Sequence, residues 1–216
     1  MCCPCYAPVV KRVSVSIVGA GRLGTALAER LADAGYGITE IVARGNQRSL
    51  MSAKELARKV DARFATVREA QLPADLVWFC VPDAEISNAA TSLLNHNWKG
   101  KTAVHSSGAL TSDVLAPLRK KGAHTASVHP LMTFVRGSIP KLEGVPFAVE
   151  GDRIALRVVR RLIHDLGGVS TPVHKRDKIA YHAFATWFVL CSCLCLPPSK
   201  KPPPGRGCPR PKPAVA

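Results

Sequence analysis

The sequence predicts an α/β protein built on a doubly wound parallel sheet, and three observations support this fold class. Apolar runs typical of buried strands alternate with segments of helical periodicity from about residue 13 to residue 130. The first predicted strand passes through a glycine-rich turn directly into a helix. Polar segments that follow several strands would meet at one edge of a parallel sheet. We expect this sheet to be followed by the start of an incomplete helical domain and by a disordered proline-rich tail.

The glycine-rich turn follows the strand at residues 13–18 and has the pattern G-x-G-x-x-G. Gly19 would permit the tight turn, Gly21 would let a pyrophosphate approach the backbone, and Gly24 would let the helix pack closely on the strand. The free N–H groups of the helix that begins near Arg22 would hold the phosphates. The pattern therefore indicates a dinucleotide-binding turn, although glycine turns also occur for structural reasons alone. Its predicted cofactor-binding residues are Gly19, Ala20, Gly21, Arg22, Leu23 and Gly24.

The end of the second predicted strand, residues 38–43, determines which nicotinamide cofactor the chain would prefer. An NAD site usually carries Asp or Glu there, about 20 residues past the glycines, to bind the ribose 2′-OH. Here Arg44 and Arg48 follow the strand, and both guanidinium groups could pair with a 2′-phosphate. Glu40 is the competing NAD candidate, but it lies in mid-strand and too early. We therefore predict NADP as the cofactor, with solvated loop charges as the alternative role of the two arginines.

The α/β alternation continues through the middle of the chain. After the first helix, which ends before Gly35, the apolar spacing predicts further elements in a regular order. They are a helix at 51–60, a strand at 63–67, a strand at 75–82, a helix at 86–94, a strand at 102–105, a helix at 112–120 and a strand at 125–128.

Three segments lie at the carboxyl ends of predicted strands and should line one crevice with the glycine turn. They are residues 81–83, 105–108 and 129–130. In an open parallel sheet, ligands bind beyond the carboxyl ends of the strands. Ser106 and Ser107 could orient a substrate oxygen or the nicotinamide amide, or could form a turn or a helix cap. The predicted cofactor-binding residues of these segments are Val81, Pro82, Ser106 and Ser107.

Composition limits the function classes. The net charge of +15 indicates attraction to anions, but aromatic residues make up only 6% and no nucleic-acid-binding motif accompanies the charge. We therefore predict a small-molecule substrate and no specific nucleic-acid partner. The eight cysteines lack the spacing of zinc sites, and neither a secretory signal nor a membrane-spanning segment is evident. A cytoplasmic protein with reduced thiols and no metal site is expected.

Several motifs together resemble a known family. The chain resembles the Rossmann-like two-domain proteins whose C-terminal half is a domain of unknown function. These proteins are related to pyrroline-5-carboxylate reductase, ketopantoate reductase, prephenate dehydrogenase and 6-phosphogluconate dehydrogenase. The resemblance covers residues 11–186 and implies an NADP-binding domain followed by an all-helical domain that dimerises and completes the substrate pocket. The motifs that carry it are GAGRLG at 19–24, VPD at 81–83, HSSGAL at 105–110, VHPL at 128–131 and KIAYHA at 178–183.

The expected long helices do not follow Thr186; the sequence instead becomes rich in cysteine, then in proline and basic residues. This change predicts a truncated helical domain, so that a dimer is doubtful here. A proline-rich ligand for an SH3-type groove is the alternative role of the tail. The predicted division is a leader at 1–10, a Rossmann NADP-binding domain at 11–150, a linker and partial helical domain at 151–190, and a disordered tail at 191–216.

Hydride transfer to a carbonyl or imine also needs a proton donor near the substrate. The candidate catalytic residues are His105, His129, Lys178 and His182, of which the last two would share one helix face. For each histidine, a hydrogen-bonded structural role is the alternative. The sequence thus predicts an NADP-dependent oxidoreductase acting on a small carbonyl, imine or hydroxy acid. The alternative is an inactive NADP-binding protein that lacks its substrate domain.

Overall fold

The structure is a computed structural model, and it describes residues 12–195 of the chain. Its strands are β1 (Val15–Val18), β2 (Ile38–Ala43), β3 (Arg63–Thr66), β4 (Leu76–Phe79), β5 (Thr102–His105), β6 (His124–Pro130), β7 (Pro146–Gly151) and β8 (Val169–Pro172). Its α-helices are α1 (Arg22–Asp33), α2 (Gln47–Lys59), α3 (Asp83–Ser92), α4 (Ala116–Lys120), α5 (Arg153–Asp165) and α6 (Lys178–Cys195). Short 3₁₀ turns at Ser112–Leu115 and Lys175–Asp177 precede α4 and α6.

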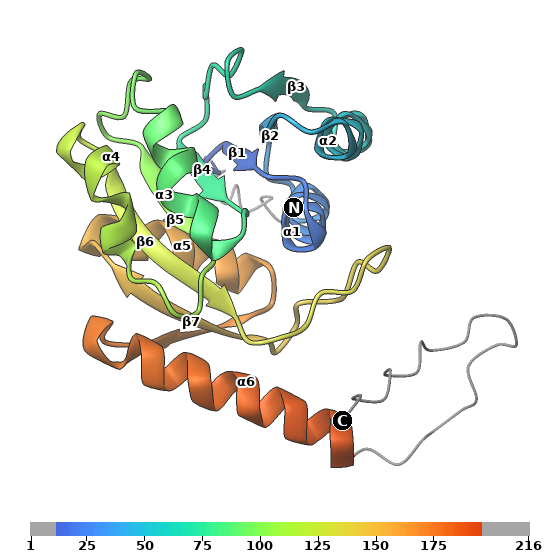
Figure 1. The fold of residues 1–216 in the computed structure, drawn as a ribbon, viewed down its shortest axis with the longest axis vertical. Coiled ribbons are helices and arrows are strands. Elements are labelled where there is room, and N and C mark those ends of the chain that lie inside the picture. Colours follow the sequence, from blue (N-terminus) through green and yellow to red (C-terminus); the bar gives the residue numbers. More distant parts are fainter. Residues whose placement is uncertain (1–11, 196–216) are drawn as a thin grey trace, which may run out of the picture.

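All eight strands belong to one sheet with the order β3-β2-β1-β4-β5-β6-β7-β8. Neighbouring strands are parallel except for β6 and β7, which are antiparallel. Strand order reverses between β1 and β4, which is the switch point where open α/β sheets bind ligands. The predicted doubly wound α/β class is therefore confirmed, with one reversed strand pair that the sequence did not indicate (Figure 1).

Helices cover both faces of this sheet. One apolar layer combines residues of α1, α2 and α5 with one set of strand side chains, and it includes Leu27, Leu56 and Leu162. A second layer combines α3 and α4 with the opposite set, and it includes Ile86 and Leu118. Because strand side chains alternate between faces, strands buried on both sides become apolar throughout. β1 and β4 are buried at every residue, and their sequences are accordingly almost entirely apolar.

The sheet extends further along the chain than the predicted domain boundary. Residues 151–190 were expected to form a linker and a partial helical domain, yet β8 pairs with β7 and α5 packs on β6, β7 and β8. The reason is the amphipathic pattern of α5, whose Ala155, Val159 and Leu162 are fully buried against the sheet. Those residues recur at helical spacing, so the signal was present in the sequence.

α6 lies outside the sheet layers and runs below the sheet in Figure 1. It continues to Cys195, into the segment predicted to be a disordered tail. The remainder of that segment, like the predicted leader, lies outside the described residues. No helix within residues 12–195 has both the length and the apolar character needed to cross a membrane.

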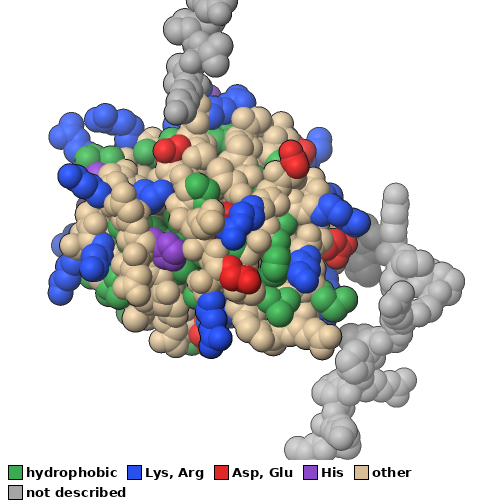
Figure 2. Space-filling view, turned by 90° about the horizontal axis from the view of Figure 1, so that it is seen from above, with side chains coloured by type: hydrophobic (Ala, Val, Ile, Leu, Met, Phe, Trp, Pro, Cys, Tyr) green, Lys and Arg blue, Asp and Glu red, His purple; other side chains and the backbone are tan. Residues whose placement is uncertain are grey.

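Positive charge is spread over the face of the molecule opposite α6. Figure 2 shows Lys and Arg side chains distributed around this face, with a few Asp and Glu side chains between them. The basic residues do not gather there into a single stripe.

Glu40 has a structural role in the interior of β2. Its carboxylate is fully buried, forms an ion pair with Arg63, and accepts hydrogen bonds from the backbone N–H groups of Gln71 and Leu72. Leu72 has a φ of 48°, a left-handed conformation that is unfavourable for a leucine. The buried carboxylate therefore secures the segment between β3 and β4.

We expect Glu40→Ala to lower the free energy of unfolding, because it leaves the buried Leu72 N–H without an acceptor. Such a loss costs about 1–3 kcal/mol for a single donor. Urea denaturation followed by circular dichroism would measure it, with the exposed Glu55→Ala on α2 as the control. Equal stability of the two variants would contradict this role of Glu40.

Candidate functional site

At two glycines of the first turn, the lack of a side chain lets neighbouring backbone segments approach closely. Gly19 has a φ of 105°, and a Cβ atom there would lie 2.6 Å from the carbonyl oxygen of Cys80. A Cβ atom on Gly24 would lie only 2.0 Å from the carbonyl oxygen of Gly19. Both positions therefore require glycine, and together they fix the start of α1 directly behind the carboxyl end of β1.

Gly21 differs from these two glycines because the space beside it is open. The nearest protein atom to a Cβ placed there is the carbonyl oxygen of Cys80, 4.0 Å away, and the residue itself is exposed. Protein packing therefore does not explain this glycine. An external group that approaches the backbone would explain it.

The N-terminus of α1 is also left open by the protein. α1 has no side-chain cap and no acidic residue in its first turn. By contrast, Asn46 caps α2, and Asp83 and Glu85 lie in the first turn of α3. The unpaired N–H groups and the helix dipole make the start of α1 suitable for an anion, and a dinucleotide pyrophosphate fits this site.

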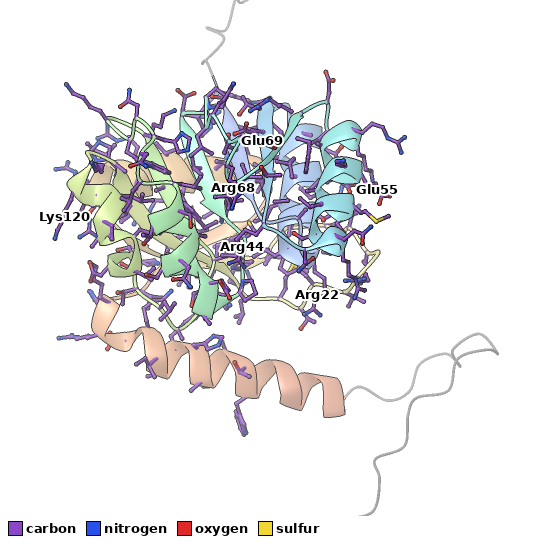
Figure 3. The ribbon with its side chains drawn as sticks, turned by 45° about the horizontal axis from the view of Figure 1, so that its top comes forward. Arg22, Arg44, Glu55, Arg68, Glu69 and Lys120 are labelled. Carbon is purple, nitrogen blue, oxygen red and sulfur yellow. The ribbon has the colours of Figure 1, made fainter. Side chains whose placement is uncertain are left out.

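The residues predicted to select the cofactor lie at the end of β2 and in the first turn of α2. Arg44, which is labelled in Figure 3, forms an ion pair with Glu85, so its guanidinium group already has an anionic partner. Arg48 is exposed and makes no hydrogen bond or ion pair with any residue in the described range. Glu40 is turned into the sheet and is unavailable to a ribose. Of these three side chains, Arg48 is the one that is free to meet a phosphate.

Lys178 joins α6 to the carboxyl ends of β5 and β6. It is 1% exposed, and its Nζ donates to the backbone oxygen of Ser107 at 2.8 Å and to Oγ of Ser127 at 2.6 Å. Ser107 in turn donates to Asp83 at 2.6 Å. The ends of β5 and β6 and the start of α3 are thus connected through one buried ammonium group.

Burial lowers the pKa of Lys178 to about 8, while the nearby carboxylates of Glu150 and Asp83 oppose this shift. Burial and the charges of His182 and Lys178 lower the pKa of His129 to about 4. At neutral pH the site therefore combines a charged lysine with a neutral histidine. This pairing offers both a proton donor and a proton acceptor.

The His105 side chain is enclosed by backbone groups on both sides. Its side chain is fully buried, its Nδ1 accepts from the N–H of Ser107, and its Nε2 lies 3.1 Å from the carbonyl oxygen of Thr111. Burial and the charge of Lys178 lower its pKa to about 4. Because both ring nitrogens are occupied by the backbone, this geometry corresponds to the structural alternative and argues against proton transfer by His105.

His129 on β6 and His182 on α6 lie together at the junction of these two elements. Their rings are perpendicular with centroids 5.4 Å apart, and Nδ1 of His129 lies 3.3 Å from the hydroxyl of Tyr181. A Cβ atom on Gly108 would lie 2.1 Å from Nδ1 of His182. Nδ1 of His182 is also the buried side-chain polar atom that lacks a hydrogen-bond partner within the described residues. The structure thus brings Lys178, His129 and His182 together where α6 packs against the ends of β5 and β6.

The predicted serines have protein partners for their hydroxyl groups. Nε1 of Trp78 donates to Oγ of Ser106 at 2.8 Å. Oγ of Ser107 donates to Asp83 and accepts from the N–H of Leu110 at 2.9 Å, which makes it a turn-forming group. The predicted Val81 and Pro82 follow β4 at the start of α3, so they lie at the same sheet edge as the glycine turn.

Sequence reasoning placed Asp83 at the ligand-binding edge only as part of the segment 81–83, and it did not single out Ser127 or Tyr181. Two signals could have drawn attention to Ser127 and Asp83. Ser127 lies two residues before His129, so both face the same side of the sheet in the extended backbone of β6. Asp83 directly follows a strand and lies in the first turn of a helix, a position that favours carboxylates.

The sheet order and the glycine turn define a doubly wound α/β protein of the Rossmann-like kind. A model of the Rossmann-like domain matches residues 7–130, and the chain belongs to this family. No curated protein matches the chain in sequence.

Solved structures share the fold over most of the chain. A Bacteroides fragilis protein provisionally described as an NADP oxidoreductase has a TM-score of 0.73 and 20% identity, with 85% of this chain and 69% of that one covered. A Thermotoga maritima protein has a TM-score of 0.66 and 27% identity, with coverages of 83% and 65%. Prephenate dehydrogenase from A. aeolicus, solved with hydroxyphenyl propionate and NAD+, has a TM-score of 0.67 and 20% identity, with coverages of 89% and 73%. The chain thus has the fold of NAD(P)-dependent oxidoreductases and spans about two thirds of their length.

The lowered pKa of Lys178 predicts a specific pH dependence of stability. Between pH 8 and the ordinary lysine pKa of 10.5, the unfolded chain binds more protons than the folded chain. The free energy of unfolding of the wild type relative to Lys178→Met should therefore rise with pH in this window, by at most about 1.4 kcal/mol per pH unit. Urea denaturation at pH 7 to 10 tests this, with the exposed Lys120→Met as the control. A difference that stays constant with pH would refute the prediction.

Proposed function

We propose that the chain is an NADP-dependent oxidoreductase that transfers a hydride to or from a small carbonyl, imine or hydroxy acid. The observation that carries the proposal is the open N-terminus of α1 behind Gly21. That end combines unpaired N–H groups, an exposed glycine without packing contacts, and the switch point of the sheet. The fold of the B. fragilis protein, described as an NADP oxidoreductase, supports it.

The preference for NADP rests on charge at the end of β2. Arg48 is free to pair with a 2′-phosphate, and Arg44 could share its guanidinium group between Glu85 and that phosphate. An NAD preference would require a carboxylate at the surface near the end of β2. Glu40 does not provide one, because it is buried and accepts a hydrogen bond from the backbone of Leu72. A 2′-phosphate would meet positive charge here, whereas a ribose 2′-OH would find no free carboxylate from β2.

The residues at the junction of α6 with β5 and β6 would supply the proton chemistry that hydride transfer requires. When bound, the reduced nicotinamide supplies the hydride. Lys178 is buried and uses two of its three N–H groups on Ser107 and Ser127, so a substrate oxygen or nitrogen would have to enter this buried junction to accept from the third. With a pKa of about 8, this lysine is charged at neutral pH and can give a proton to the carbonyl oxygen or imine nitrogen when the hydride adds to the carbon. His182 lies on the same face of α6, one turn further on, and is the second candidate donor.

Gly21→Val should abolish cofactor binding and leave the fold intact. The valine side chain would occupy the space that the pyrophosphate needs, whereas no protein atom lies close enough to be displaced. Titration of NADPH fluorescence and circular dichroism would measure the two effects. Gly37→Val is the control, because that glycine also has open space around it but lies at the opposite end of the sheet. Unchanged binding in Gly21→Val would mean that the turn is structural only.

Arg48→Ala should weaken NADPH binding and leave NADH binding unchanged. Loss of a charge-assisted contact costs about 1.5–3 kcal/mol, or roughly 10- to 150-fold in Kd. Glu85→Gln should act in the opposite direction on NADPH, because it releases Arg44 and removes a carboxylate. Equal wild-type affinities for the two cofactors would contradict the NADP preference.

Oxidation of NADPH in the presence of a panel of small ketones, imines and keto acids tests whether the chain is an oxidoreductase. Binding of NADPH without its oxidation would contradict the proposed hydride transfer and leave only the assignment of a cofactor site.

A further inference from the structure

The connection between β6 and β7, residues 131–145, reaches from one side of the sheet to the glycine turn. Because β6 and β7 are antiparallel, this connection begins and ends at the same sheet edge as the turn. Figure 1 shows it as a long arm that extends toward α1. Arg30 of α1 fixes it by donating to the backbone oxygens of Pro140 at 3.0 Å and Ile139 at 2.5 Å. The arm is therefore held against α1 by two hydrogen bonds.

A cavity of about 370 Å³ lies between this arm, the glycine turn and α2. Gly21 and Arg22 line it on the side of the turn, and residues 135–139 line it on the side of the arm. Neither Arg44 nor Arg48 belongs to its lining. The cavity thus opens on the predicted pyrophosphate position and is separate from the residues expected to meet a 2′-phosphate.

The free charges of this cavity lie on the arm and at the turn. Arg22 and Arg136 make no hydrogen bond or ion pair with any residue between 12 and 195. Lys59 is neutralised by Glu29 at 2.6 Å. Glu55 on α2 is the remaining charged group of the lining. Figure 3 shows Arg22 and Glu55 at separate points of this side of the molecule. An anion would therefore be favoured between the turn and the arm.

We propose that Arg136 binds the diphosphate of the cofactor from the side opposite the glycine turn, so that the arm and the turn clamp this group between them. The proposal rests on the proposed function, because it assumes a dinucleotide at the start of α1. Arg136 and Arg22 would each pair with a phosphate, while the N–H groups of α1 approach from behind Gly21. Arg30 would act as a positioning residue, since it contacts the arm and does not line the cavity.

The diphosphate assignment makes a distinct prediction about ligand dependence. Arg136→Ala should weaken NADPH, NADH and ADP-ribose by a similar factor of about tenfold, because all three contain the diphosphate. AMP lacks a diphosphate and should be affected much less. Arg48→Ala should instead affect NADPH alone. Arg30→Ala should reproduce the pattern of Arg136→Ala with a smaller loss, because it releases the arm without removing the charge.

Lys141→Ala is the matched control, because Lys141 is an exposed cation on the same connection and does not line the cavity. Dissociation constants would be measured on the full chain by isothermal titration calorimetry, and circular dichroism would establish that each variant is folded. Wild-type binding with no change in Arg136→Ala would overturn the clamp and leave the proposed function standing. A loss confined to NADPH would assign Arg136 to the 2′-phosphate and overturn the diphosphate contact. Failure of the wild type to bind any of the dinucleotides would refute both proposals.

Discussion

The close approach of two backbone segments at the first turn is the constraint on which the rest of the site depends. Gly24 lies so near the carbonyl oxygen of Gly19 that any Cβ atom would collide with it. This contact places the start of α1 directly against the end of β1, where the N–H groups of the helix point out of the sheet edge. Without this contact, the position of the N-terminus of α1 relative to the ends of β1, β4 and β5 would not be fixed.

Lys178 fixes the start of α6, as the contact between Gly19 and Gly24 fixes the start of α1. A buried ammonium group is unfavourable unless hydrogen bonds compensate for lost hydration, and Ser107 and Ser127 provide two of them. The lysine thereby ties the first turn of α6 to the ends of β5 and β6. His129 and His182 meet across the same junction, so the position of α6 determines how these two histidines face one another.

The parts of the fold that depend on local pattern could be predicted from the sequence. β2 and β5 match their predicted bounds because each is an apolar run with clear limits. The reversed pair β6–β7 could not be predicted, since strand direction depends on where the chain packs after the loop at 131–145. For the site, spacing indicated that Lys178 and His182 share a helix face. It did not show that His105 is enclosed by the backbone of Ser107 and Thr111, because that contact exists only after the turn has folded.

Because Glu40 is buried, it stabilises the backbone before β4 and cannot also bind the ribose of a cofactor. Because this carboxylate holds Leu72 in its left-handed conformation, it cannot be moved to the surface without disturbing the path between β3 and β4. An engineer who wished to convert the chain to a different dinucleotide would gain nothing by repositioning Glu40. The substitutions would have to be made beyond the strand, in the exposed segment around Arg44 and Arg48, where side chains can be exchanged without reopening the core.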